Sequence, residues 1–171
     1  TSSTPSCPLP PPGWLPSAGA WFLSGVTALH RPARPWVNVL ANPGFGTQVS
    51  EAGRGYSWGE NSRLNQLTPW SNDAVADGCG EWLLLQDMRT HQAWSMTPSA
   101  AGDAEAHYRV AHGQGYTVIG HRHGALEASV TWCVDNETAV KQVRVRLTNR
   151  GHRTLQLRLR LSTELRPQKR A

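Results

Sequence analysis

The chain has 171 residues, the size of one domain or of a piece of one, and its 16 glycines, 12 prolines and 8 tryptophans favour a turn-rich β protein over a helical one. No run of about 18 apolar residues occurs, which excludes a predicted transmembrane helix from this stretch of sequence. The net charge of +5 is too unevenly distributed to indicate a uniformly basic, nucleic-acid-binding protein.

The N-terminal part differs in character from the rest of the chain. Residues 1–16 are rich in Pro and Ser, and residues 17–35 show no clear hydrophobic period. We therefore predict an irregular segment over residues 1–34, a β-sandwich domain over 35–164 and a short basic tail over 165–171.

Strand-like alternation begins at Trp36 and continues almost to the C-terminus, with turn signals between short segments. Leu126 to Val134 alternates most regularly, which places its apolar residues on one face. The predicted strands are 37–41, 45–50, 56–58, 81–87, 91–97, 108–111, 115–121, 126–134, 141–149 and 154–162. The expected architecture is all-β, an antiparallel β-sandwich with almost no helix.

The last two predicted strands contain most of the positive charge. Residues 141–171 hold ten of the 17 Lys and Arg with one acid, so residues 1–140 carry a net charge of −4. Basic residues alternate with apolar ones here, which is typical of the solvent face of strands, so we expect no nucleic-acid partner. These two strands are predicted to form a hairpin across residues 150–153. The alternating arginines are Arg144, Arg146, Arg158 and Arg160.

The cysteines and histidines give no metal site by their spacing. Cys7, Cys79 and Cys133 are odd in number and widely spaced, which favours reduced thiols in a cytosolic compartment. His121 and His123 could form a ligand pair on one strand face, but no third ligand stands at a fixed spacing. We predict hydrogen-bonded or exposed histidines and no metal.

The segment from Trp36 to Asp73 has the highest density of chemically useful side chains. Aromatic rings stand among amides, carboxylates and an arginine, and flat apolar faces beside such planar polar groups suit a sugar ring. Residues 60–76 read as a long polar loop, and long ordered loops are usually functional. We predict a carbohydrate-contacting site in this loop.

Several long motifs resemble a known family. The stretch PWVNVLANPGFGTQVSEAGRGYSWGENSRLNQLTPWSND, from Pro35, resembles the N-terminal β-supersandwich domain of glycoside hydrolase family 94, a galactose-mutarotase-like fold. It is similar in particular to the phosphorylase-like region of bacterial cyclic β-1,2-glucan synthases. GEWLLLQDMRTHQAWSMTP, YRVAHGQGYTVIGHRHG and VKQVRVRLTNRGHRTLQLRL follow in the order expected of the family.

Both ends depart from the family pattern. Family members carry a Gly-Gly-Phe-type segment ahead of the Pro-Trp pair, which residues 1–34 lack, and the chain ends in LRPQKRA where the family continues the sandwich. The resemblance therefore covers residues 35–164 and implies an incomplete sandwich flanked by foreign sequence. The genomic reading frame on either side would test this hypothesis.

The resemblance implies chemistry that this chain does not perform alone. Family members transfer or phosphorolyse a β-glucosidic bond with inversion, with inorganic phosphate as the nucleophile, and the acid and phosphate site belong to an (α/α)6 barrel. The sequence has no helical periodicity for such a barrel, so we assign no catalytic residue and no cofactor, and expect the isolated chain to be inactive. The implied partners are a β-glucan oligosaccharide, that barrel and a second subunit. The implied location is the cytoplasm, or the cytoplasmic side of the inner membrane within a larger membrane enzyme.

The resemblance also implies roles within the loop, because family loops of this kind help to shape the sugar site. Arg63 would donate to sugar hydroxyls or phosphate, Trp58 or Trp70 would stack on a ring, and asparagines would orient hydroxyls. The alternative is a loop that folds on itself through Asx turns, with a Trp as an interdomain plug. A free-standing carbohydrate-binding module is the rival function. The candidate site residues are Trp58, Asn61, Arg63, Asn65, Trp70, Asn72 and Asp73.

Overall fold

The computed structural model describes residues 20–27, 35–70, 80–98 and 106–165, and every regular element in these ranges is a β-strand. The strands are β1 (Ala20–Val26), β2 (Val37–Asn42), β3 (Phe45–Ser50), β4 (Ser57–Gly59), β5 (Glu81–Asp87), β6 (Ala93–Ser95), β7 (Tyr108–Gly113), β8 (Tyr116–His123), β9 (Leu126–Val134), β10 (Lys141–Asn149) and β11 (Leu157–Thr163). The predicted all-β antiparallel architecture is confirmed. The described ranges contain no helix that is long and apolar enough to cross a membrane.

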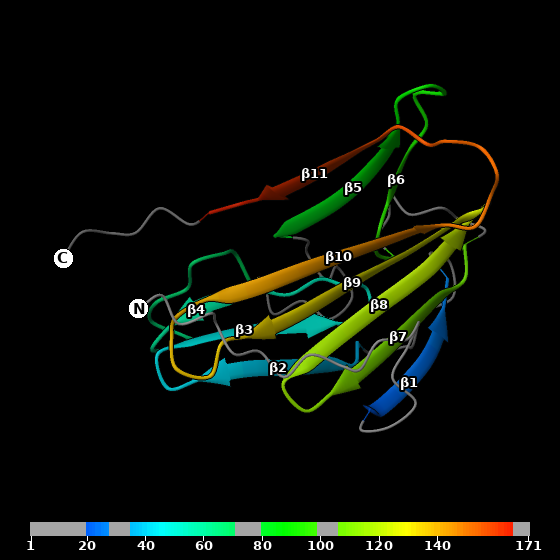
Figure 1. Cartoon of the computed structure of the whole chain (residues 1–171). Helices are drawn as coiled ribbons and strands as arrows, with labels where there is room; N and C mark the ends of the chain where they lie inside the picture. Colours follow the sequence, from blue (N-terminus) through cyan, green and yellow to red (C-terminus); the bar gives the residue numbers. More distant parts are fainter. Residues whose placement is uncertain (1–19, 28–34, 71–79, 99–105, 166–171) are drawn as a thin grey trace, which may run out of the picture.

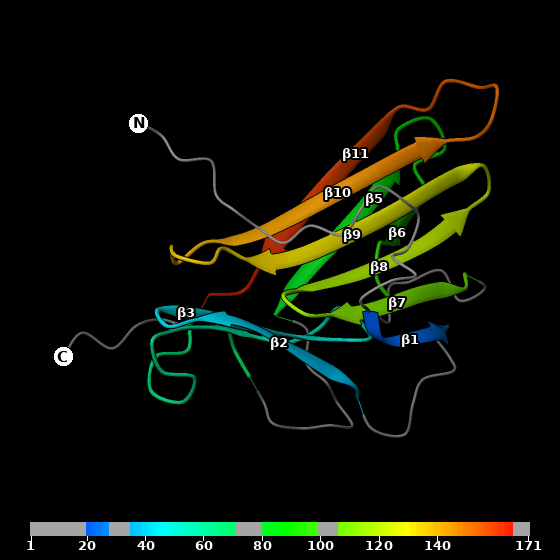
Figure 2. The ribbon, with the colours of Figure 1, turned by 60° about the horizontal axis from the view of Figure 1, so that its bottom comes forward.

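The strands form three antiparallel sheets. A five-stranded sheet has the order β1-β7-β8-β9-β10, and two three-stranded sheets have the orders β11-β5-β6 and β2-β3-β4. Figure 1 shows the five-stranded sheet running through the middle of the molecule, and Figure 2 shows β2 and β3 at the opposite side of it from β11. One apolar cluster contains residues from all three sheets, so they share a core.

The regular alternation of β9 provides much of this core. Its predicted inward face is confirmed, since every apolar residue on it is at most 6% exposed. Leu83 and Leu85 of β5 and Trp94 of β6 pack onto the same cluster from the facing sheet. The inward residues of β9 are Leu126, Ala128, Val130, Trp132 and Val134.

Two asparagines of β2 attach its small sheet to the five-stranded one. Asn38 Nδ2 donates to the carbonyls of Gly113 and Tyr116, at 2.9 Å each. Asn42 Nδ2 donates to the carbonyls of Asp135 and Thr138, at 2.7 and 2.8 Å. The amides therefore fix the position of the β2-β3-β4 sheet against two turns of the main sheet.

The predicted hairpin between the last two strands is wrong. β10 pairs with β9 in the five-stranded sheet, whereas β11 pairs with β5 in a different sheet. Residues 150–156 carry the chain from one sheet to the other. The alternation of apolar and polar residues fixes which side chains of a strand share a face, but it does not fix which strand lies beside it. Because the chain crosses from one sheet to the other, β10 and β11 both turn an apolar face toward the shared core.

Two other expectations need correction. Residues 20–26 were predicted to be irregular, but they form β1, which pairs antiparallel with β7 at the edge of the main sheet. Main-chain pairing with a neighbouring strand needs no hydrophobic period, which is why the sequence pattern missed it. Cys133 is disulfide-bonded, so the expected reduced thiol is wrong for this residue. Cys7 and Cys79 lie outside the described residues.

Candidate functional site

Three aromatic side chains form a compact group, here called the aromatic triad, at the start and end of the predicted loop. The ring of Tyr56 lies between the other two, with centroids 5.0 Å from Trp58 and 4.9 Å from Trp70. The Tyr56 and Trp70 rings are nearly parallel, at 15°. Tyr56 is buried, whereas Trp70 is 39% exposed, so the triad presents tryptophan to solvent on a tyrosine support.

A glycine lets the Trp58 ring lie flat on the sheet. Gly46 pairs with Trp58 across β3 and β4, and a Cβ on Gly46 would come within 2.3 Å of the indole. Ala41 pairs with Gly46 on the other side, so these residues share the outer face of the small sheet. Val37 and Val39 extend the same face along β2 and are 46% and 56% exposed. The result is an outer apolar strip that ends at the triad.

Hydrogen bonds below the triad hold the loop in place. Ser57 N donates to Thr68 Oγ1 at 2.8 Å, and Ser57 Oγ donates to Thr47 Oγ1 at 3.0 Å. All three residues are buried. Leu67 N also donates to the Ser57 carbonyl at 2.9 Å, which returns the loop to the sheet beside β4. Sequence reasoning missed these positions, although polar residues at the inward sites of alternating strands were a usable signal.

The loop itself is folded through local turns. Asn61 Oδ1 accepts from the backbone N–H groups of Arg63 and Leu64, at 2.9 Å each, which is an Asx turn. Asn65 N donates to the Asn61 carbonyl at 3.0 Å, and the Asn65 carbonyl accepts from Gly59 N at 3.1 Å. Glu60 takes a left-handed conformation, with φ 53°, where the loop leaves β4. The loop therefore contains at Asn61 an Asx turn of the kind that the alternative predicted.

The turns leave the tip of the loop exposed. Leu64 is 83% exposed, and the side chain of Arg63 beside it is also exposed. An exposed guanidinium has its five N–H donors available to a ligand. Of the predicted residues, Trp58 lies on β4, and the segment that follows β4 carries the others that the structure describes: Asn61, Arg63, Asn65 and Trp70. Asn72 and Asp73 lie outside the described residues.

A groove continues the outer strip at its other end. Its volume is about 590 Å³, and Trp36, Val37, Val39 and the turn Gly113–Gly115 line it. Trp36 is 57% exposed, so its ring is accessible along this groove. His112 also lines it, and burial lowers the pKa of the His112 imidazole below its usual value. A neutral, apolar groove of this kind suits an uncharged ring more than an anion.

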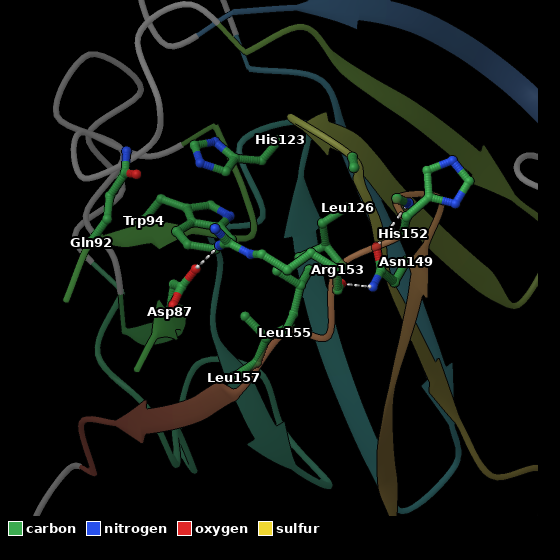
Figure 3. Close-up of a pocket in the computed structure, with 12 residues that line it drawn as sticks. Asp87, Gln92, Trp94, His123, Leu126, Asn149, His152, Arg153, Leu155 and Leu157 are labelled. Atoms are coloured by element: carbon green, nitrogen blue, oxygen red, sulfur yellow. Dashed lines mark hydrogen bonds and ion pairs between the residues drawn. The ribbon is translucent and has the colours of Figure 1, made fainter. Parts of the chain in front are cut away.

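A second pocket of about 240 Å³ lies where β5, β6 and the β10–β11 connection meet (Figure 3). Its polar groups are largely used within the protein. Asp87 Oδ1 accepts from Arg89 N at 2.8 Å, Asp87 Oδ2 lies 3.7 Å from the Arg153 guanidinium, and Asn149 Nδ2 donates to the Arg153 carbonyl at 2.7 Å. The Arg89 N–H is the main group that lowers the pKa of Asp87. The contacts of this pocket therefore serve mainly to hold β5 and the β10–β11 connection together.

Two histidines of β8 and two glutamates of the sandwich are held by protein contacts. His121 Nε2 accepts from Trp94 Nε1 at 3.2 Å, and the His123 ring stacks on Trp94 at 4.3 Å. Glu51 accepts from Trp36 N at 2.7 Å, and Glu81 forms an ion pair with Lys141 at 2.5 Å. The described residues contain no group of three or more His, Cys, Asp or Glu that could hold a metal ion.

Comparison with known proteins gives a consistent set of relatives. Residues 25–166 match the family described as glycosyl hydrolase 94, supersandwich domain. The cyclic beta-(1,2)-glucan synthase NdvB of Rhizobium meliloti (strain 1021) is 34% identical over 126 residues, which cover 74% of this chain and 4% of that protein. The N,N'-diacetylchitobiose phosphorylase of Vibrio furnissii is 29% identical over 134 residues, 76% of this chain and 17% of that protein. That of Vibrio proteolyticus is 30% identical over 108 residues, 62% of this chain and 13% of that protein. The chain thus spans at most 17% of the length of these curated relatives.

Proposed function

The chain belongs to the glycosyl hydrolase 94 supersandwich-domain family, and on that premise we propose that it is a carbohydrate-contacting domain of a larger glycosyl-transferring or phosphorolytic enzyme. The observation that carries this proposal is the aromatic triad, in which Trp58 and Trp70 flank a loop that carries the exposed Arg63. We further propose a β-1,2-glucan chain as the ligand, because one relative bears the name of a cyclic beta-(1,2)-glucan synthase.

The proposed contact uses complementary parts of the site. The Trp58 and Trp70 rings would cover the C–H faces of glucose units, and the Arg63 guanidinium would donate paired hydrogen bonds to their hydroxyls or to phosphate. The outer strip would support the next units of an extended chain. Asn61 would act differently from the sequence prediction, since its Oδ1 already accepts two backbone N–H groups and only its Nδ2 would reach the ligand.

The chemistry of bond transfer would lie elsewhere in the enzyme. Glu51 and Glu81 are already bonded within this domain, so neither is offered as a general acid. We propose that an (α/α)6 barrel supplies the acid and binds inorganic phosphate, and that this domain delivers or steadies the glucan. A second subunit could receive the same loop.

The test is calorimetric binding of a linear β-1,2-glucan oligosaccharide to the 171-residue chain and to its Trp58→Ala and Trp70→Ala variants. Loss of one stacking ring should weaken binding by about tenfold, which corresponds to about 1.4 kcal/mol. Gly46→Ala is a subtler variant, since it keeps Trp58 but displaces its ring. Trp82→Ala, on β5 in another sheet, is the matched control and should bind normally. Equal binding by all variants would refute the choice of site.

The rival, a free-standing carbohydrate-binding module, differs in what the chain does alone. Glucan binding that is equally tight with and without a catalytic barrel joined to the chain would favour the module. Binding that is measurable in the isolated chain and tightens when a barrel is joined would favour the proposed domain of a larger enzyme. The triad alone supports either reading, because its rings and loop contacts lie within this chain.

We place the enzyme in the cytoplasm or on the cytoplasmic side of the inner membrane. The disulfide at Cys133 opposes this placement, because reducing compartments disfavour disulfides. Alkylation of free thiols in intact cells, followed by mass spectrometry of the Cys133 peptide, decides the point. An alkylated Cys133 supports the cytoplasmic side, and an unreactive, oxidised Cys133 excludes it.

A further inference from the structure

One side of the sandwich is open in the described part of the chain. β10 ends the order of the five-stranded sheet and β11 ends the order of its facing sheet, so each has a neighbour on one side only. Figures 1 and 2 both show these two strands at the side of the molecule away from β1. Each therefore presents a row of backbone donors and acceptors that can pair with another strand.

The inward side chains at this edge are not covered. Leu159 and Leu161 stand opposite Leu85 and Leu83, so they point to the same face of their sheet as those buried residues. Yet Leu159 is 44% and Leu161 is 57% exposed, while Leu85 and Leu83 are at most 5% exposed. On β10, Leu147 is similarly 39% exposed. Apolar side chains on the core-facing side of both strands are therefore exposed at this edge.

The outward side chains of the same strands are basic. Arg158 and Arg160 on β11 are exposed, as is Arg146 on β10, and Arg144 beside it is half-buried. The ion pairs of this region in the described residues join Lys141, Arg150 and Arg153 to acids, and they include none of these four arginines. A strand arriving at this edge would meet leucine on one face and positive charge on the other.

We propose that this open edge, defined by β10, β11 and their exposed leucines and arginines, receives a β-strand whose apolar residues alternate with acidic ones. The two-residue period of both rows selects a strand over a helix, since helical side chains recur every three to four residues. Apolar residues of the incoming strand would cover Leu159 and Leu161, and its carboxylates would pair with Arg158 and Arg160. The inference does not depend on glucan binding by the triad.

An acidic strand fits this edge better than a second copy of this chain. Antiparallel pairing of β11 with its own copy about Leu159 would place Arg158 opposite Arg160 of that copy. Pairing about Arg160 would place that arginine opposite itself, and like charges directly opposite each other destabilise a strand pair. Pairing about Leu161 would set Arg158 opposite Glu164 of the copy, but it leaves Arg160 opposite Ser162. An alternating acidic strand instead places a carboxylate opposite both arginines.

The test uses the 171-residue chain and a labelled peptide that alternates Glu and Val over the length of β11. The matched control peptide alternates Lys and Val. We expect the acidic peptide to bind at least about tenfold more tightly, by fluorescence anisotropy at low salt. Hydrogen exchange should slow in Leu157–Thr163 on binding and remain unchanged in Tyr56–Trp58, which lies in another sheet.

Two variants make the test specific. Arg158→Glu with Arg160→Glu, both exposed, should reverse the preference toward the Lys–Val peptide without disturbing the core. Leu64→Asp, on the exposed loop tip, is the control and should change nothing. Equal binding of both peptides, or protection outside β10 and β11, overturns the proposal. So does a dimer in sedimentation velocity that Leu161→Asp dissociates, because a second copy would then occupy the edge.

Discussion

Strands β9 and β11 have similar hydrophobic patterns and opposite environments. Both alternate apolar residues with other residues over most of their length, LEASVTWCV in one and LRLRLST in the other. On β9 the inward face is closed, and Val130 at its centre has no exposure. On β11 the equivalent Leu161 is 57% exposed. The alternation tells which residues share a face, and the position of the strand in its sheet decides whether that face is covered.

The difference follows from the two sheet orders. β9 lies between β8 and β10, and its inward residues belong to a core cluster that includes residues of both three-stranded sheets, so its side chains have neighbours on every side. Among the described strands β11 pairs with β5 alone, and Leu159 and Leu161 on its inner face are exposed. Stability should therefore be concentrated on β9, whereas interaction with other molecules should be concentrated on β11.

Truncation of one inward side chain on each strand is the strongest test of this difference in burial. Trp132→Ala on β9 removes a side chain that is 2% exposed, and it should lower the free energy of unfolding by about 3–5 kcal/mol. Leu161→Ala on β11 should lower it by less than about 1 kcal/mol, because little area is lost from the core. Urea denaturation followed by tryptophan fluorescence and circular dichroism measures both.

The outcome is informative in either direction. If Leu161→Ala costs as much as Trp132→Ala, the inner face of β11 is covered in solution, and the open edge is not available to a partner. A dependence of the Leu161→Ala effect on protein concentration would locate that cover in a second molecule.

Strands β9, β10 and β11 show which parts of the fold could be predicted from the sequence. The bounds of Leu126–Val134 and Lys141–Asn149 were predicted correctly, because an unbroken period of two is a local property. The partner of β11 was predicted wrongly, since pairing with β5 across seventy or more residues leaves no local pattern.

The candidate site was predictable to a similar degree. The rings of Trp58 and Trp70 and the exposed Arg63 were found from residue type and loop length. The sequence could not show that Asn38 and Asn42 bind backbone carbonyls of the main sheet, because a planar amide suits a sugar hydroxyl and a peptide carbonyl equally well.

An asparagine substitution tests how much side-chain hydrogen bonds, as distinct from apolar packing, contribute to attaching the small sheet to the main one. Asn42→Asp keeps the oxygen that accepts from Gly44 N and Phe45 N, but it replaces the Nδ2 donor that serves two carbonyls. Leaving those carbonyls opposite a carboxylate should destabilise the fold by about 1–3 kcal/mol.

Asn61→Asp is the matched control for this change. Its Oδ1 also accepts two backbone N–H groups, while its Nδ2 makes no bond of this kind. The control should leave the free energy of unfolding within about 0.5 kcal/mol of the parent. Equal effects of the two substitutions would mean that the donors of Asn42 contribute nothing to the attachment of the small sheet.

The smallest predicted effect concerns pH and the buried His112 on β7, which lines the groove beside Trp36. Burial lowers its pKa below 6.5 in the folded protein, and a hydrogen bond to the Trp36 backbone only partly opposes this. The unfolded chain therefore binds a proton first, so stability is complete above pH 6.5 and falls as the pH drops through 6.5 toward the lower folded value.

One proton limits this fall to about 1.4 kcal/mol per pH unit. Urea denaturation between pH 7.5 and 5.5 measures it, above the range where most carboxylates titrate. His112→Asn should remove this part of the pH dependence, and His152→Asn, at an exposed position, should keep it. An unchanged slope in His112→Asn would show that the imidazole takes up a proton without unfolding. The groove beside Trp36 would then be open to water and ligand charge, which would weaken the case for an uncharged ring there.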